Sequence, residues 1–276
     1  MSANSETIDG KETTFHYRKQ DNKPVRFLVF GCIHATRACP HAVQAVVDFI
    51  LKNRPDVVCI NGDLYDLEAF MGGARGEGEP VADDIDAGTA IFQRVAAASK
   101  KAGATLVMLE GNHEQRLRRY ISSSNEVVAI AAQMLLHRLE ELVRKAGGIY
   151  VPYDGIFQGY RIAGVVLVTH GTIFNQMAPR DMAEMYAKGG VRYVIFNHTH
   201  GAGVAIGRRD DAPIGINAGN LLRRRLMGYA HGRRQTFAWN QAYAYGETDG
   251  ETAHILLHIH PQELEGKPWR TPRWPF

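Results

Sequence analysis

The chain has 276 residues, of which 45% are hydrophobic and 22% are charged, and its formal net charge is only +3. This composition excludes an intrinsically disordered chain, and no apolar stretch approaches the roughly 20 residues that a membrane-spanning helix needs. The three cysteines lack the regular spacing of a disulfide framework. We therefore expect a globular, cytoplasmic protein with free thiols and no membrane partner.

The two ends of the chain differ in composition from its centre. The opening residues, MSANSETIDGKETT, are polar and lack the apolar core of a signal peptide, so residues 1–20 are expected to be a frayed leader. Residues 21–262 are predicted to form one domain. The segment 263–276 contains three prolines and pairs basic with aromatic residues. This pattern predicts an extended tail that packs either on the body or on a partner subunit of a homo-oligomer.

Three short apolar runs open the domain, at residues 25–30, 56–60 and 105–109, and each has the composition of a buried strand. Segments with helical spacing, 40–53 and 83–102, separate these runs. The resulting β-α-β-α-β order favours a sheet of parallel strands.

The second half of the chain changes character after one long helix, which is predicted over 125–145 with Asn125 as its N-cap. Short strand candidates then crowd together, including 165–169 and 193–196. An alternating strand at 253–260 closes the domain. We therefore expect two sheets, the second with more antiparallel pairing.

Five polar clusters come directly after strand candidates, where an α/β sheet presents functional side chains. A single histidine in such a place is most often a hydrogen-bonded loop residue, but five clusters in succession predict a shared site. They are GCIHA with His34, NGDLYD with Asp63 and Asp66, EGNHE with Asn112 and His113, THG with His170, and NHTHG with His198 and His200.

The residue types in these clusters point to metal ions. Imidazole and carboxylate groups suit zinc, iron, manganese and nickel, and two such ions about 3.5 to 4 Å apart can hold both the attacking and the leaving oxygen of a phosphoryl transfer. Asp63 is the natural bridging carboxylate, because Gly62 lets the backbone turn sharply beside it.

The order and spacing of the clusters resemble the calcineurin-like metallophosphoesterase superfamily over residues 32–200. The superfamily pattern is Asp-x-His, Gly-Asp-x-x-Asp, Gly-Asn-His-Asp/Glu, a lone His, and Gly-His-x-His. This chain departs from the pattern at Cys32, which replaces the first aspartate, and at Asn197, which replaces a glycine. The resemblance implies an α/β fold in which two mixed β-sheets pack face to face and are flanked by helices, a four-layer α-β-β-α sandwich.

The resemblance also implies ligands for two divalent ions, which would be Mn, Zn, Fe or Ni. The first ion would be held by residue 32 together with His34, Asp63 and His200. The second would be held by Asp63, Asn112, His170 and His198.

The same resemblance implies that His113 is not a ligand. It would act near the leaving group, as a general acid or by stabilising charge, and Asp66 would orient it. A hydroxide activated between the ions would be the nucleophile, so no covalent thiol is needed.

Three interpretations of Cys32 stay open. Its thiolate ligates the first ion, since sulfur is a good ligand for zinc and iron. Alternatively, Cys32 packs as a small apolar residue and leaves a weaker first site. In the third interpretation, only the second ion binds.

The predicted centre indicates phosphoester hydrolysis but not the substrate. Phosphoprotein phosphatases usually continue the second motif with Arg-Gly, whereas this chain has Leu67 and Glu68. We therefore expect a phosphodiesterase or nuclease that acts on nucleic acid or nucleotides. A phosphomonoesterase for a small metabolite is an alternative, and a non-catalytic scaffold, supported only by Cys32, is another.

Two basic clusters are candidates for substrate binding. The first, EQRLRRY, follows the GNH motif, so Arg116 is expected near the pocket, although helical geometry turns some of these arginines away. The second, LLRRRLMGYAHGRR, follows the last histidine motif and offers Arg223, Arg224 and His231 as phosphate-binding groups.

Aromatic residues lie close to the second basic cluster in the sequence. Tyr229, Phe237 and Trp239 are able to stack on bases, as aromatic residues of single-strand binders do. The alternative is that these rings belong to the core of the second sheet and that the arginines are solvated.

Overall fold

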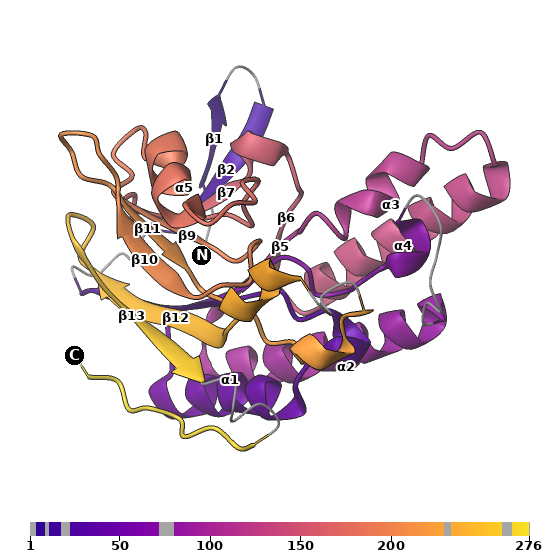
Figure 1. The fold of residues 1–276 in the computed structure, drawn as a ribbon, viewed down its shortest axis with the longest axis horizontal. Helices are drawn as coiled ribbons and strands as arrows, with labels where there is room; N and C mark the ends of the chain where they lie inside the picture. Colours follow the sequence, from indigo (N-terminus) through magenta and orange to yellow (C-terminus); the bar gives the residue numbers. More distant parts are fainter. Residues whose placement is uncertain are drawn as a thin grey trace.

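The computed structural model describes residues 4–8, 11–17, 23–71, 80–228, 233–260 and 267–275. Within these ranges the chain forms two mixed β-sheets flanked by helices, which confirms the predicted fold class (Figure 1). No helix of the described part is both long and apolar enough to cross a bilayer.

The six-stranded sheet has the order β13-β12-β3-β4-β5-β6. Its strands are β3 (Val25–Phe30), β4 (Val57–Asn61), β5 (Thr105–Leu109), β6 (Ile149–Val151), β12 (Gln241–Thr248) and β13 (Ala253–His260). The strands β3 to β6 are parallel, as the β-α-β order predicted. Antiparallel β12 and β13 complete the sheet on the side of β3.

The seven-stranded sheet has the order β1-β2-β7-β8-β9-β11-β10. Its strands are β1 (Asn4–Ile8), β2 (Lys11–Tyr17), β7 (Gly159–Ile162), β8 (Val166–Val168), β9 (Tyr193–Phe196), β10 (Gly203–Ile206) and β11 (Ile214–Asn217). The sheet contains both parallel and antiparallel pairs, with β8, β9 and β11 parallel to one another at its centre.

The helices form the outer layers. They are α1 (Pro40–Asn53), α2 (Val81–Ala102), α3 (Gln115–Tyr120), α4 (Glu126–Lys145) and α5 (Ala178–Tyr186), and the 3-10 turns are η1 (Ala35–Arg37), η2 (Glu68–Phe70), η3 (Gly155–Phe157), η4 (Arg224–Leu226) and η6 (Arg234–Ala238). Figure 1 shows α1 and α2 on one side of the sheets and α5 on the other.

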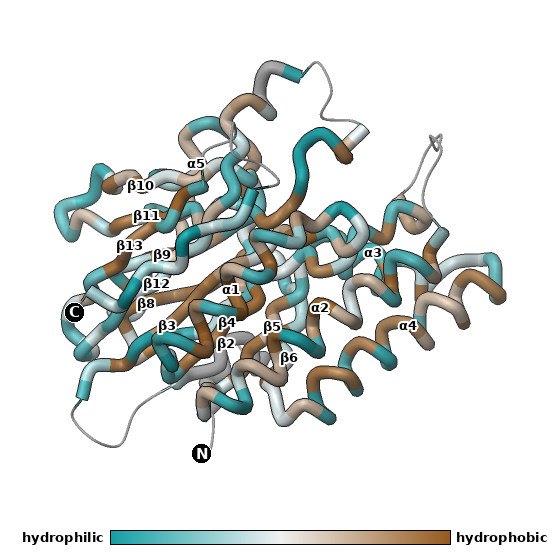
Figure 2. The backbone as a smooth tube through the Cα atoms, turned by 90° about the horizontal axis from the view of Figure 1, so that it is seen from below, coloured by the Kyte–Doolittle hydropathy of each residue, from teal (hydrophilic) through white to brown (hydrophobic). Residues whose placement is uncertain are grey.

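Strand alternation explains the layers, because successive side chains of a strand point to opposite faces. In β3, Leu28 and Phe30 join the core that contains residues of α1, α2 and α4. Their neighbours Phe27 and Val29 join the core between the sheets, together with residues such as Ile195 of β9. The tube in Figure 2 accordingly shows strongly apolar strands in the middle of the molecule.

The long helix α4 begins as predicted. The side-chain oxygen of Asn125 accepts hydrogen bonds from the backbone N–H groups of Val127 and Val128, at 3.1 and 3.3 Å. These bonds satisfy donors that have no partner inside the helix.

The N-terminal residues differ from the expected frayed leader. They form β1 and β2, and β2 pairs in parallel with β7, from Thr14 opposite Gly159 to Tyr17 opposite Ile162. Tyr17 is buried in the core between the sheets. The sequence signal here is the β-propensity of threonine, phenylalanine and tyrosine rather than hydrophobic periodicity.

The last two strands return to the six-stranded sheet, whereas the sequence suggested that late strands belong to the second sheet. Strand β13 has the predicted bounds, but it pairs with β12, which in turn pairs with β3. Hydrophobic periodicity predicts a strand but does not predict which strand it pairs with. Strand β12 was not predicted from the sequence, because small residues such as Ala242 and Ala244 interrupt its hydrophobic pattern.

The C-terminal tail packs on its own chain. The ring of Trp274 lies 5.8 Å from Phe49 and 5.6 Å from Tyr245, and its backbone N–H donates to Asn53. Trp269 stacks on Tyr243, with 5.8 Å between ring centroids. Of the two predicted positions for the tail, the structure therefore shows the one on the body; the domain limits 21–262 stay a prediction.

Candidate metal centre

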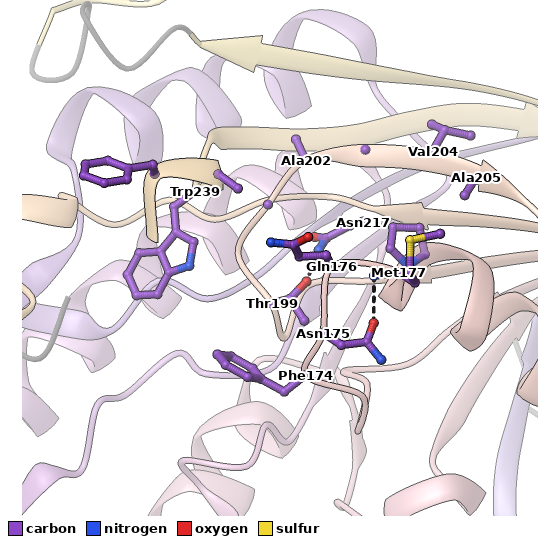
Figure 3. A pocket seen from close by; sticks show the side chains of 15 residues that line it. Phe174, Asn175, Gln176, Met177, Thr199, Ala202, Val204, Ala205, Asn217 and Trp239 are labelled. Atoms are coloured by element: carbon purple, nitrogen blue, oxygen red, sulfur yellow. Dashed lines mark hydrogen bonds between the residues drawn. The ribbon is translucent and has the colours of Figure 1, made fainter. Parts of the chain in front are cut away.

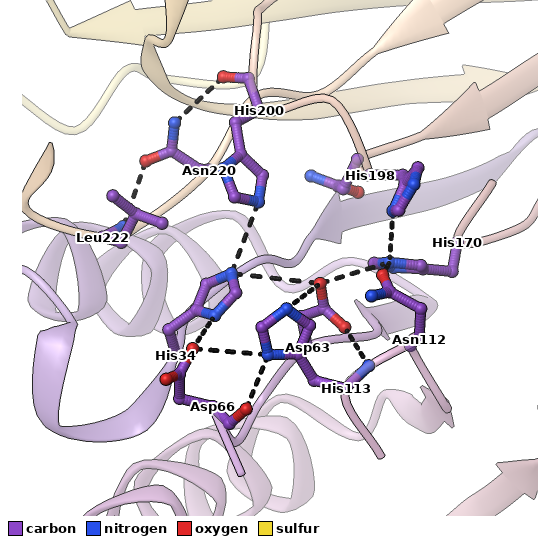
Figure 4. A network of polar contacts seen from close by, with 12 residues as sticks. His34, Asp63, Asp66, Asn112, His113, His170, His198, His200, Asn220 and Leu222 are labelled. Carbon is purple, nitrogen blue, oxygen red and sulfur yellow. Dashed lines mark hydrogen bonds and ion pairs between the residues drawn. The ribbon is translucent and has the colours of Figure 1, made fainter. Parts of the chain in front are cut away.

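The five polar clusters converge at the ends of β3, β4, β5, β8 and β9, which belong to both sheets (Figure 4). Close backbone approach makes this possible. A Cβ atom on Gly62 would lie 2.3 Å from Nδ1 of His170, and one on Gly111 would lie 2.0 Å from Oδ1 of Asp63. Glycine is therefore required at both turns.

Two groups of ligand atoms share the carboxylate of Asp63. The sulfur of Cys32 and ligand atoms of His34, Asp63 and His200 all lie within 4.8 Å of one another, and so do those of Asp63, His170 and His198. Asn112 adjoins the second group. All seven residues predicted as ligands, six in the two groups and Asn112 beside them, thus lie close together.

Hydrogen bonds at the outer ring nitrogens orient two of the histidines. His34 Nδ1 lies 2.8 Å from a carboxylate oxygen of Asp66, and His170 Nδ1 lies 2.9 Å from the backbone oxygen of Asn61. Both oxygens only accept, so each Nδ1 is assigned the hydrogen. In the neutral imidazoles, the lone pair on each Nε2 then points into the centre.

The atoms that face these lone pairs are themselves mostly acceptors. His170 Nε2 lies 3.3 Å from Oδ2 of Asp63 and 3.0 Å from Oδ1 of Asn112. His34 Nε2 lies 3.3 Å from Nε2 of His200. Convergent acceptors need a cation between them, and a ligating histidine typically donates its other N–H to a carboxylate or carbonyl. The residues therefore fit divalent metal ions.

Burial and neighbouring charges shift the pKa values of the site residues in different directions. Burial alone would raise the pKa of Asp63, but the charges of His170 and His113 hold it well below the usual range of an aspartate. Burial alone would lower the pKa of His170, yet the Asp63 carboxylate raises it. Burial and His170 lower the pKa of His198 to about 4, so this imidazole is in the neutral form that binds metal.

Cys32 is fully buried in the first group. Burial and the charges of Asp63 and Glu114 raise the pKa of its thiol. The sulfur therefore holds a proton at neutral pH until a cation compensates its charge, and a coordinated metal ion does so.

Left-handed backbone conformations gather at the predicted ligands. The φ angles of Cys32, His34, Asp63 and His200 are 49°, 53°, 51° and 64°. Such conformations are strained for residues with a side chain and occur preferentially at functional sites. All four residues belong to the first group of ligand atoms.

Asp66 positions two histidines. Its Oδ1 lies 2.8 Å from Nδ1 of His34 and 3.3 Å from Nδ1 of His113, and its backbone oxygen lies 2.6 Å from the same atom of His113. Hydrogen bonds from His113 and His34 overcome the effect of burial and hold the pKa of Asp66 far below its usual value. The other ring nitrogen of His113, Nε2, lies 3.1 Å from Nη2 of Arg116.

Two charged residues of the site had no predicted role. Arg37 donates to the second carboxylate oxygen of Asp66 and, at 2.5 Å, to Glu68. Glu114 accepts from the backbone N–H groups of Asp63, Tyr65 and Gly111. Membership of the GNHE motif was the only feature of the sequence that pointed to a role for Glu114. Nothing in the sequence pattern indicated that Arg37 belongs to the site.

The predicted substrate-binding arginines have different surroundings. Arg116 lies at the centre, with Nη2 at 3.1 Å from Nε2 of His113, whereas Arg118 turns away and pairs with buried Glu110. The backbone N–H of Arg223 donates to the backbone oxygen of Arg37.

The rest of the second basic cluster lies beside aromatic residues. Arg224 lies over the ring of Phe237 at 5.3 Å from its centroid. Phe237 is 65% exposed, and buried Trp239 packs with Leu222 and Met227, so neither ring belongs to the core between the sheets. Tyr229 and His231 lie outside the described residues.

A sandwich of two mixed sheets with histidines and a shared carboxylate at its strand ends is the structure of a metal-dependent hydrolase. The model of the calcineurin-like phosphoesterase family matches residues 25–202, which is more than half of the chain. The chain belongs to this family and is therefore a phosphoester hydrolase. No curated protein matches the chain.

Proposed function

We propose that this phosphoester hydrolase is a phosphodiesterase with a two-metal centre, acting on nucleic acid or nucleotides. The observation that carries the proposal is the position of Asp63, whose carboxylate belongs to both groups of ligand atoms. A carboxylate so placed is suited to bridge two ions of the kind that assist in-line phosphoryl displacement.

Seven residues would hold the ions. The first ion would be held by Cys32, His34, Asp63 and His200, and the second by Asp63, Asn112, His170 and His198. When bound, the ions act as Lewis acids that activate water and polarise the phosphate group. A thiolate from Cys32 favours zinc or iron over manganese at the first position.

His113 would transfer a proton to the leaving oxygen. The backbone carbonyl of Asp66 fixes the hydrogen on Nδ1, at 2.6 Å, which leaves Nε2 to exchange the catalytic proton. Arg116 adjoins that nitrogen and would bind a phosphate oxygen, since guanidinium groups make strong, directional bonds to phosphate.

The surroundings of Arg224 support a nucleic-acid or nucleotide substrate. Arg224 and exposed Phe237 form a stacked pair, and proteins that bind single strands combine cationic groups with aromatic rings in this way. Arg223 adjoins Arg37 through the backbone, so the basic segment begins close to the groups that position Asp66. We also propose a reducing cytoplasmic setting, since the three cysteines are free and buried.

The test compares substrates on protein loaded in turn with Mn, Zn, Ni and Mg. The substrates are p-nitrophenyl phosphate, bis-p-nitrophenyl phosphate and a single-stranded oligonucleotide. We expect the diester and the oligonucleotide to be hydrolysed with a higher kcat/KM than the monoester. Preference for the monoester would support the small-metabolite alternative instead, and a metal-loaded protein that cleaves no diester contradicts the proposal.

A further inference from the structure

A cavity of about 740 Å³ opens beside the metal centre (Figure 3). It lies between the loop that precedes α5, the segment from Thr199 to β10, and the end of η6. Figure 3 shows Trp239 at one end of it and Met177 toward the other. The volume is within the range of about 300 to 1,000 Å³ that is typical of small-molecule sites.

Three lining residues connect this cavity to the predicted ligands. Thr199 stands between His198 and His200 in the chain. The ring of Phe174 lies 5.8 Å from that of His198, edge to face, and the ring of Trp239 lies 4.3 Å from that of His200. A group bound in the cavity would therefore adjoin a phosphate held at the centre.

The walls of the cavity are apolar and aromatic. Phe174, Phe237 and Trp239 supply three rings, and the residues that line the cavity include no Asp, Glu, Lys, Arg or His. Phe174 is 61% exposed and Phe237 is 65% exposed, so both rings are accessible to a ligand. The bound group should therefore be uncharged and should present flat apolar faces.

The cavity also contains polar groups that can hydrogen-bond to a ligand, which a hydrocarbon could not match. Asn217 donates its side-chain N–H to the hydroxyl oxygen of Thr199, which leaves the hydroxyl hydrogen of Thr199 available as a donor. Gln176 also lines the cavity, and its side chain is exposed. A carboxamide offers both a donor and an acceptor, and this combination matches the ring heteroatoms and exocyclic groups of a heterocycle.

We propose that this cavity binds a nucleobase of the substrate, with the base stacked among the aromatic residues and its phosphodiester at the metal centre. The inference rests on the proposed phosphodiesterase activity. A nucleobase is uncharged, flat and edged with donors and acceptors, and so meets each of the three requirements. An acyl chain would leave the polar groups of Thr199 and Gln176 without partners.

The first experiment separates base recognition from hydrolysis. It measures kcat/KM for a thymidine dinucleotide and for its abasic analogue, in which tetrahydrofuran replaces both nucleosides. Phe237→Ala should lower kcat/KM for the dinucleotide by about tenfold, since stacking of one base contributes about that factor, and should leave the abasic analogue unchanged. Phe157→Ala is the matched control, because Phe157 is 49% exposed and does not line the cavity. Equal losses on both substrates, or no loss on either, overturn the proposal.

The second experiment does not depend on turnover. Calorimetric titration of the metal-loaded protein compares thymidine 5′-monophosphate with 2-deoxyribose 5-phosphate. We expect the nucleotide to bind about tenfold more tightly and Phe237→Ala to remove that difference. If the protein binds the nucleotide more tightly but hydrolyses no diester, the proposed function is contradicted while the proposed nucleobase site is supported. Equal binding of both compounds by the unmodified protein overturns the nucleobase site whatever the activity.

Discussion

The carboxylate of Glu114 accepts a hydrogen bond from the backbone N–H of Asp63, with 3.0 Å between oxygen and nitrogen. The same carboxylate accepts from the backbone N–H groups of Gly111 and Tyr65, at 2.7 and 2.9 Å. Glu114 thereby ties the turn after β4, which carries Asp63, to the turn after β5, which carries Asn112. Together with the hydrogen bond from the backbone N–H of His113 to Oδ1 of Asp63, at 3.0 Å, this buried side chain fixes the spacing of ligands from two separate strands.

Replacement of Glu114 by glutamine should weaken metal binding. The amide nitrogen of glutamine cannot accept, so at least one of the three backbone donors is left without a partner. We expect metal affinity to fall by about 10- to 100-fold, as for other groups that orient ligands, and the free energy of unfolding to fall by about 1–3 kcal/mol. Calorimetry with a metal titrant measures the first quantity. Exposed Glu251→Gln is the control, and unchanged metal affinity in Glu114→Gln would contradict this role.

Cys32 should make metal binding depend on pH. Burial and neighbouring carboxylates raise the pKa of the thiol, so the sulfur is protonated near pH 7 and must lose its proton to become a ligand. Because one proton is released per ion at this position, apparent affinity should rise by about tenfold per pH unit below the thiol pKa.

The comparison that isolates this effect uses Cys32→Ser and Cys32→Ala. Proton release on metal binding, measured by calorimetry in buffers of different ionisation enthalpy, should fall by about one per chain in both variants. Two tightly bound ions in Cys32→Ser, with proton release unchanged, would show that the thiolate is not a ligand.

His113→Ala should remove turnover and keep the metal ions. General acid catalysis contributes about 10²- to 10⁴-fold, so kcat should fall by that factor, while metal content per chain stays the same because none of the seven proposed ligands is changed. Single-turnover kinetics and elemental analysis of the same sample give both numbers. A variant that loses metal together with activity would show that His113 is a ligand.

Arg37 should act on catalysis through Asp66. Its guanidinium neutralises the carboxylate that orients both His34 and His113. We expect Arg37→Met to lower kcat by about tenfold with little change in KM, since a positioning residue acts on the reacting group rather than on substrate affinity. Arg94→Met, at an exposed arginine that bonds to Gln44, is the control. An equal effect of both variants would contradict the role of Arg37.

Trp274 should contribute to the stability of the fold but not to catalysis. Its ring packs on Phe49 and Tyr245, on the opposite side of the six-stranded sheet from the core between the sheets. We expect Trp274→Ala to lower the free energy of unfolding by about 1–3 kcal/mol, less than a fully buried tryptophan would, with unchanged kcat. Chemical denaturation tests this expectation, and a loss of activity in the folded variant would contradict it.

The sequence predicted that the five polar clusters meet in space because their residues lie in short motifs at strand ends. Gly62 and Asp63, for example, are adjacent in the chain, and the requirement for a glycine at a sharp turn is visible without coordinates. The partners of these residues were less predictable. Arg37 contacts Asp66 only because η1 and the turn after β4 lie side by side in the fold. No local sequence pattern predicts that contact.

The cavity could not be predicted from the sequence either. Phe174 and Trp239 are far apart in the chain and come together only because both adjoin the same histidine loop. Strand order was predicted only in part for a similar reason. Residues 244–248 of β12 pair with β3 across most of the chain length, and local periodicity carries no information on such a partner.

The most direct test of the central claim is an anomalous difference map from crystals of the manganese- or zinc-loaded enzyme. The account predicts two peaks about 3.5 to 4 Å apart, one on each side of the Asp63 carboxylate, the first beside Cys32 and His200 and the second beside His170 and His198. A single peak, or two peaks that do not share Asp63, would contradict it.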